Sequence, residues 1–165
     1  QHSGTISVYS EIGKGTTFTI YLPLLHRAAT EEQTRQNVTP GTRGTETVLV
    51  AEDDKMVLAL IKAVLEEYGY RVLEAQDGEQ AVCLFSENRD RIQLVILDTI
   101  MPKMNGREAF LSIKAIRPDV KALFMSGYTA NVIHKKGILN PDKELIIKPF
   151  SPHAFLQKVR QILDT

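Results

Sequence analysis

The sequence predicts an α/β protein in which helices cover both faces of a parallel β-sheet. From residue 47 onward, short apolar runs alternate with segments whose apolar residues recur every three or four positions. The runs are apolar throughout rather than alternating with polar residues, which indicates strands that are buried on both faces. Strands that alternate with helices in this way are joined by right-handed crossovers, so the expected architecture is a doubly wound sheet of five strands.

The expected strands cover residues 47–51, 71–75, 93–97, 122–125 and 142–147. Four of them run directly into charged or hydroxyl side chains. In open parallel sheets, ligands bind beyond the carboxyl ends of the strands. We therefore expect one edge of the sheet to gather five candidate site residues, namely Glu52, Asp53, Asp98, Ser126 and Lys148.

The helices between these strands are expected from apolar periodicity. The first presents an apolar face of residues 57, 60, 61, 64, 65 and 68 and stops at Gly69, and the next two cover residues 78–87 and 107–116. Residues 129–136 form a weaker helix, and Pro152 opens the last one at a position where its missing N–H costs nothing. Cys83, the single cysteine, excludes an internal disulfide, and its place in a helical pattern predicts a small buried side chain.

The predicted cluster of acids has a direct chemical consequence. Two carboxylates about 4 Å apart repel by about 4 kcal/mol when the effective dielectric constant is about 20. Lys148 offsets part of this repulsion, and a hard, oxygen-seeking cation such as Mg²⁺ would offset the rest. Taken alone, Asp98 could equally cap a loop, and we expect Asp54 to cap the first helix rather than to bind a metal.

Charge and hydropathy exclude other classes of protein. Lysine and arginine total 20 against 20 aspartate and glutamate, so no overall attraction to nucleic acid or to an anionic membrane is expected. No apolar run has the length of a membrane span, and the first residues lack the pattern of a secretory leader. We expect a soluble, cytoplasmic protein in a reducing compartment.

The first 46 residues have a different character. Residues 5–10 and 17–22 alternate polar and apolar around a glycine-rich connection, which predicts a β-hairpin, and an isolated hairpin is marginal in water. Residues 2–23 resemble the last segment of the ATP-binding domain of sensor histidine kinases, including Gly13, Gly15 and Thr16. The boxes that precede this segment in that family are absent, so we expect a fragment of a larger kinase that cannot itself bind ATP. Residues 24–46 are expected to be a linker because they are polar and contain few apolar residues.

Residues 47–164 resemble a response-regulator receiver domain. Glu52 and Asp53 match its acidic pair, residues 98–106 its phosphoacceptor strand end, residues 126–127 its hydroxyl and small residue, and residues 148–150 its lysine motif. The four motifs occur in order over most of the chain. Known sheets of this type have the flavodoxin-like strand order 2-1-3-4-5, which would place Asp53 beside Asp98. The expected domains are therefore residues 1–23, a linker at 24–46 and a receiver at 47–165, as in a hybrid sensor histidine kinase.

The resemblance implies a role for each matched residue. Asp98 would accept a phosphoryl group from phosphohistidine, with Lys148 and Ser126 contacting that group. Mg²⁺ would be bound by Asp53, Asp98 and the backbone carbonyl of Ile100, and by Glu52 through water. Lys148 and Pro149 would be joined by a cis peptide bond. The partner would be a kinase dimerisation and phosphoacceptor region or a histidine phosphotransfer protein, and the full-length kinase could be anchored in a membrane.

Three other functions are alternatives to this one. A haloacid dehalogenase type of phosphatase needs a second aspartate two residues after the first, where this chain has Ile100, and a flavodoxin needs hydroxyls and amides where this chain has residues 52–54. A pseudo-receiver that binds proteins without being phosphorylated stays open, because a fold does not fix a function. The chain also has Leu145 where receivers often carry Tyr or Phe, so a switch would be read out through Ser126, the helix at 129–136 or Tyr128.

Overall fold

The computed structural model describes residues 4–23, 42–127 and 144–165, which fall into two compact units, residues 1–37 and 38–165. Each unit is described by itself. Most of the expected linker, Tyr128 and the expected helix at 129–136 lie outside the described residues.

The larger unit is built on a parallel sheet, as predicted. Its described strands are β3 (Thr47–Ala51), β4 (Arg71–Ala75), β5 (Ile92–Asp98), β6 (Lys121–Ser126) and β7 (Leu145–Ile147). Their order is β4-β3-β5-β6-β7, which confirms the predicted order 2-1-3-4-5. In the register of the sheet, Ala51 lies opposite Leu97 and Asp98 lies opposite Met125. The residues that follow β3, β5 and β6 therefore meet at one edge.

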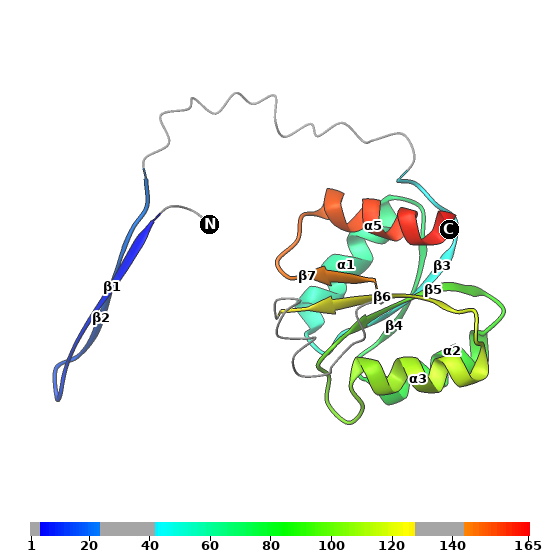
Figure 1. Cartoon of the computed structure of the whole chain (residues 1–165), viewed down its shortest axis with the longest axis horizontal. Helices are drawn as coiled ribbons and strands as arrows, with labels where there is room; N and C mark the ends of the chain where they lie inside the picture. The colour runs from blue at the N-terminus through cyan, green and yellow to red at the C-terminus, as the bar shows by residue number, and fades with distance from the viewer. Residues whose placement is uncertain (1–3, 24–41, 128–143) are drawn as a thin grey trace. The chain divides into compact units, whose positions relative to one another are not determined.

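Helices cover both faces of this sheet (Figure 1). The described helices are α1 (Lys55–Glu67), α2 (Gly78–Asn88), α3 (Gly106–Ile116) and α5 (Pro152–Asp164). Side chains of α2 and α3 join one buried cluster with alternate strand residues, and side chains of α1 and α5 join the other. No helix in the described part of the chain is both long and apolar enough to cross a membrane.

Two expectations about helix faces are wrong. Leu60 was placed on the inner face of α1 but is 63% exposed, whereas Leu58, which was not expected there, is only 4% exposed. The side of α1 that packs on the sheet is centred on residues 58, 61 and 65, so Leu60 projects past the edge of the contact. Cys83 is exposed rather than buried, because α2 turns Ala81 and Phe85 toward the sheet instead.

The residues just before β3 are attached to the larger unit. Gly44 donates its N–H to the carbonyl of Tyr68 (3.1 Å), and Glu46 accepts a hydrogen bond from the Arg160 guanidinium of α5 (2.8 Å). Residues 42–46, assigned to the linker from the sequence, thus have partners on the end of α1 and on α5.

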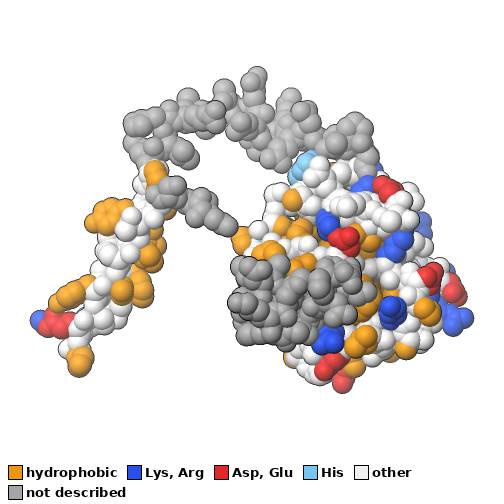
Figure 2. All heavy atoms as spheres, viewed as in Figure 1, with side chains coloured by type: hydrophobic (Ala, Val, Ile, Leu, Met, Phe, Trp, Pro, Cys, Tyr) orange, Lys and Arg blue, Asp and Glu red, His pale blue; other side chains and the backbone are white. Residues whose placement is uncertain are grey.

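The smaller unit contains the predicted hairpin, with β1 (Thr5–Glu11) antiparallel to β2 (Gly15–Tyr21). Ile6 pairs with Ile20 and Val8 with Phe18, so these four side chains share one face of the hairpin. Each of them is more than 60% exposed. Hydrophobic side chains stand out along the hairpin in Figure 2. A face of this composition is typical of a strand pair that packs against something else.

Candidate functional site

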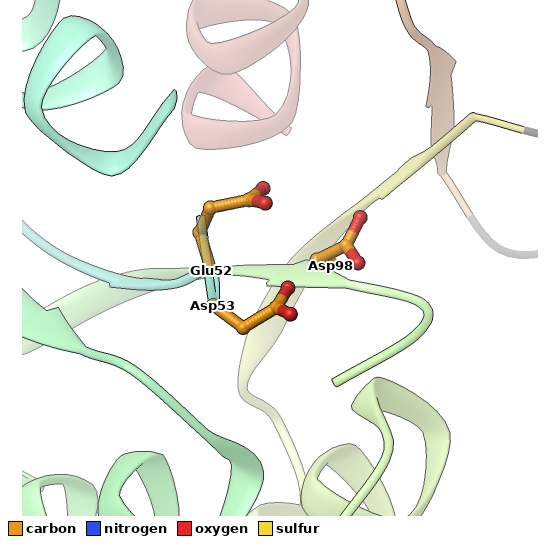
Figure 3. A group of neighbouring side chains, drawn as sticks. All are labelled: Glu52, Asp53 and Asp98. Carbon is orange, nitrogen blue, oxygen red and sulfur yellow. The ribbon is translucent and has the colours of Figure 1, made fainter. Parts of the chain in front are cut away.

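The structure brings together three carboxylates that the sequence placed at one edge of the sheet. Glu52 and Asp53 follow β3, and Asp98 is the last residue of β5. One carboxylate oxygen from each lies within 4.8 Å of the others, and the three side chains converge in Figure 3. Glu52 and Asp98 are buried, whereas Asp53 is exposed at the mouth of the cluster. Neighbouring strands in the sheet order thus supply the cluster.

Lys148 lies among these acids. It follows β7, and its ammonium Nζ is 2.5 Å from Glu52 Oε2 and 3.0 Å from Asp98 Oδ1. The peptide bond from Lys148 to Pro149 is cis, as the family resemblance implied. The sequence places Lys148 among the acids but does not single out Glu52, whose contact with Lys148 is the shorter of the two. The side-chain rotamers that decide this pairing are not encoded in a local motif.

Burial and pairing change the acid–base behaviour of both partners. Burial raises the pKa of the Glu52 carboxyl above its usual value, and the hydrogen bond from Lys148 reverses only part of that rise. Burial lowers the pKa of the Lys148 ammonium, but its hydrogen bonds to Glu52 and Asp98 outweigh burial, so its pKa lies above the usual value. Lys148 therefore stays charged at neutral pH. One ammonium can balance the charge of only one of the three carboxylates.

The backbone around Asp98 is held closely. Ile100 donates its N–H to Asp98 Oδ2 (3.1 Å), and Thr99 donates its N–H to the carbonyl of Met125 (2.9 Å). At Gly106, the first residue of α3, a Cβ would overlap the carbonyl oxygen of Asp98, so a larger residue does not fit. These contacts fix both the main chain and the carboxylate of Asp98.

Ser126 lies at the same edge of the sheet. It ends β6, directly after the residue that pairs with Asp98, and it is fully buried. Its carbonyl accepts a hydrogen bond from the N–H of Lys148 (2.7 Å), which joins the ends of β6 and β7. The structure thus places all five of the predicted strand-end residues at one edge.

The residues present suit a hard divalent cation. Glu52, Asp53 and Asp98 each offer a carboxylate oxygen, and these oxygens lie close enough together to surround one ion. Oxygen donors of this kind are the ligands that Mg²⁺ prefers. Sulfur and imidazole donors are missing from this group of side chains, which disfavours the softer metals.

One contact near the site was missed from the sequence. Lys103, in the loop after β5, pairs with Asp77, whose side chain also caps α2. Asp77 and Gly78 stand just before an apolar helical pattern, and this signal of a helix start could have identified the cap. It could not have identified Lys103 as its partner, because the two residues are far apart in the chain.

Comparison with known proteins gives one family. The model of the response regulator receiver domain matches residues 48–160. The chain is 32% identical over 172 residues to the sensor kinase CckA of Brucella abortus, covering 99% of this chain and 18% of that protein. It is 30% identical over 118 residues to the transcriptional regulatory protein CpxR of Escherichia coli K12, covering 70% of this chain and 48% of that protein. The chain thus spans less than half the length of either relative.

A solved structure agrees with these matches. The crystal structure of the receiver domain from the hybrid histidine kinase CckA superimposes with a TM-score of 0.60 at 29% identity, covering 71% of this chain and 98% of that one. The uncovered part of this chain is comparable in length to the first 46 residues.

The raised pKa of Glu52 predicts a pH dependence of stability. Because the folded protein binds a proton at Glu52 more tightly than the unfolded chain does, the contribution of this residue to the free energy of unfolding falls as pH rises from its ordinary pKa of 4.5 through the raised value. We expect wild type to lose stability relative to Glu52→Gln across this window in urea unfolding with EDTA present. Saturating Mg²⁺ should make this stability difference depend less on pH. If wild type instead gained stability relative to Glu52→Gln as pH rises, the raised pKa of Glu52 would be contradicted.

Proposed function

The chain belongs to the response regulator receiver family, and from this premise we propose that Asp98 accepts a phosphoryl group from a phosphohistidine. One observation carries the proposal: the Lys148 ammonium contacts the Asp98 carboxylate inside a cluster of acids that faces solvent at Asp53. A carboxylate held in this way is oriented for attack and has a cation beside it for an incoming anion.

The transfer can be written atom by atom. A carboxylate oxygen of Asp98 attacks the phosphorus, an O–P bond forms and the P–N bond to the histidine breaks, so that the imidazole leaves with the bonding electron pair and is protonated by solvent. Lys148 then moves its contact from the carboxylate to an oxygen of the bound phosphoryl group. Ser126 donates its hydroxyl hydrogen to another phosphoryl oxygen. Positioning and charge neutralisation are the main demands of such a reaction.

Mg²⁺ would balance the negative charge of the carboxylates that Lys148 leaves unbalanced. Asp53, Asp98 and the carbonyl of Ile100 would hold it directly, and Glu52 through water. When bound, it supplies neutralisation of the phosphoryl oxygens. Glu52 has a second role in this arrangement, since it holds the Lys148 ammonium in place at 2.5 Å.

A phosphohistidine protein must also reach Asp98, and an apolar groove lies beside the site. The groove has a volume of about 240 Å³ and is formed by α1 and the start of α5 around Lys148. Its lining residues are Val57, Leu60, Ile61, Val64, Pro149, Phe150, Pro152 and Phe155. The partner would be a kinase phosphoacceptor region or a histidine phosphotransfer protein that seats an apolar surface here.

The hairpin supports a place in a longer kinase. Its apolar face is exposed, and the match to the sensor kinase CckA covers 99% of this chain and so includes the hairpin. We propose that residues 1–23 are the end of a kinase ATP-binding domain, that residues 24–46 link it to the receiver, and that the receiver signals by a conformational switch after phosphorylation. Leu145 lies partly buried in β7, so any such switch works without an aromatic ring at this position.

Phosphorylation of Asp98 can be tested directly. We expect the protein incubated with Mg²⁺ and a small phosphodonor such as acetyl phosphate to gain one acid-stable, hydroxylamine-sensitive phosphoryl group, measured by intact mass spectrometry. Asp98→Asn and wild type in EDTA should gain none. A wild type that neither a small donor nor a phosphohistidine protein can label would favour a pseudo-receiver that acts only by binding.

Docking in the groove predicts a difference between donors. Leu60→Ala removes an exposed side chain of the groove, so transfer from a phosphohistidine protein should slow by about fivefold or more, as for other central contact residues. Labelling by the small donor should not change. Leu111→Ala on α3, where the side chain is 55% exposed, is the matched control and should affect neither rate. Equal slowing by both variants would argue against this groove.

The origin of the hairpin predicts protection in the longer protein. Amide hydrogen exchange at residues 5–21 should be slower when the chain is expressed with the segment that precedes it in its reading frame, because the apolar face would then be covered. The receiver residues serve as the internal reference. Unchanged exchange in the hairpin would contradict its assignment to a kinase domain.

A further inference from the structure

An ion pair outside the acidic cluster holds the loop between β5 and α3. The Lys103 Nζ lies 2.5 Å from Asp77 Oδ2. The side chain of Asp77 is nearly buried, while that of Lys103 is largely exposed. The pairing shifts both groups: the hydrogen bond from Lys103 lowers the pKa of Asp77, and the hydrogen bond to Asp77 raises the pKa of Lys103. Both side chains are therefore charged at neutral pH.

Lys103 has an uncommon backbone conformation. Its φ is +62°, and among the described residues it is the only one other than glycine with a positive φ. Met104 donates its N–H to the carbonyl of Pro102 (2.7 Å), which closes a tight turn around Lys103. A side chain disfavours this conformation, so the surrounding structure must hold it.

Asp77 is a fixed anchor for that purpose. Its Oδ1 accepts a hydrogen bond from the N–H of Gln80 (2.8 Å) as the N-cap of α2, while its Oδ2 receives Lys103. The next residue, Gly78, lies so close to the loop that a Cβ would overlap the carbonyl oxygen of Met104. The start of α2 therefore contacts the loop through both a side chain and the backbone.

The loop so fixed carries groups of the proposed site. Ile100 donates its N–H to Asp98 Oδ2 (3.1 Å), and its carbonyl belongs to the metal-binding set proposed above. We propose that Asp77 and Lys103 are positioning residues, which hold this loop so that the Ile100 carbonyl is presented to Mg²⁺ and the Asp98 carboxylate is kept in orientation. Neither residue touches the reacting atoms, and the inference depends on the proposed function.

The test separates the ion pair from the structural role of each residue. Asp77→Asn keeps a good N-cap acceptor for α2 but removes the charge that holds Lys103. Lys103→Gly removes the ammonium while suiting the positive φ. For both variants we expect Mg²⁺ affinity, measured by calorimetry on the full chain, to fall by about threefold to tenfold. This lies between the effect of losing an exposed ion pair and that of losing a residue that orients a metal ligand. The rate of labelling at saturating Mg²⁺ and the midpoint of thermal unfolding should stay near wild type.

Two controls complete the test. Lys103→Arg retains the charge and should restore most of the affinity. Lys62→Gln breaks another ion pair of 2.5 Å, between Lys62 of α1 and Glu74 of β4, and should leave Mg²⁺ binding unchanged. Wild-type affinity in Asp77→Asn or Lys103→Gly would overturn the positioning role while leaving the proposed function intact. A wild type that binds no Mg²⁺ would overturn both.

Discussion

The contact of one partly buried ammonium with two buried carboxylates is the constraint on which the rest of the site depends. Lys148 reaches Glu52 and Asp98 from a third strand, so the three charges meet only if β3, β5, β6 and β7 keep their parallel order and register. Each charge loses solvation on burial and regains stabilisation only from the others, so loss of one partner leaves an uncompensated charge. The register of the sheet and the electrostatics of the site therefore support each other.

This arrangement also leaves negative charge at the site that Lys148 does not balance. Lys148 balances part of the negative charge of Glu52, Asp53 and Asp98, and the raised pKa of Glu52 shows that burial weighs more on it than its partner relieves. A fold that retains such an excess at an open edge favours a bound cation. A cation there would in turn allow an anionic phosphoryl group to approach a carboxylate, which two like charges would otherwise resist.

The sequence predicted those parts of the structure that follow from chain direction and periodicity. The strand-end residues could be placed together because the carboxyl ends of parallel strands share an edge, and Asp54 could be assigned as a cap from its position. The exposed Leu60 and Cys83 were misplaced, because apolar spacing marks a broad stripe of a helix but not the part of it that the sheet covers. The pairing of Lys148 with Glu52 and of Lys103 with Asp77 depends on rotamers and loop conformation, which only the assembled tertiary structure decides.

The strand ends and the loop after β5 differ in how firmly they hold the residues of the site. Asp98 is paired with Met125 in the sheet, and Glu52 donates its N–H to the carbonyl of Ala75 at the end of β4, so both positions persist as long as the strands pair. The carbonyl of Ile100 lies in the loop that follows β5, and a loop ordinarily has several accessible conformations. The proposed metal site, which would draw ligands from both a strand end and this loop, needs separate restraint on the loop. The cap of α2 can supply it, because a helix N-terminus already fixes the orientation of the Asp77 carboxylate that Lys103 reaches.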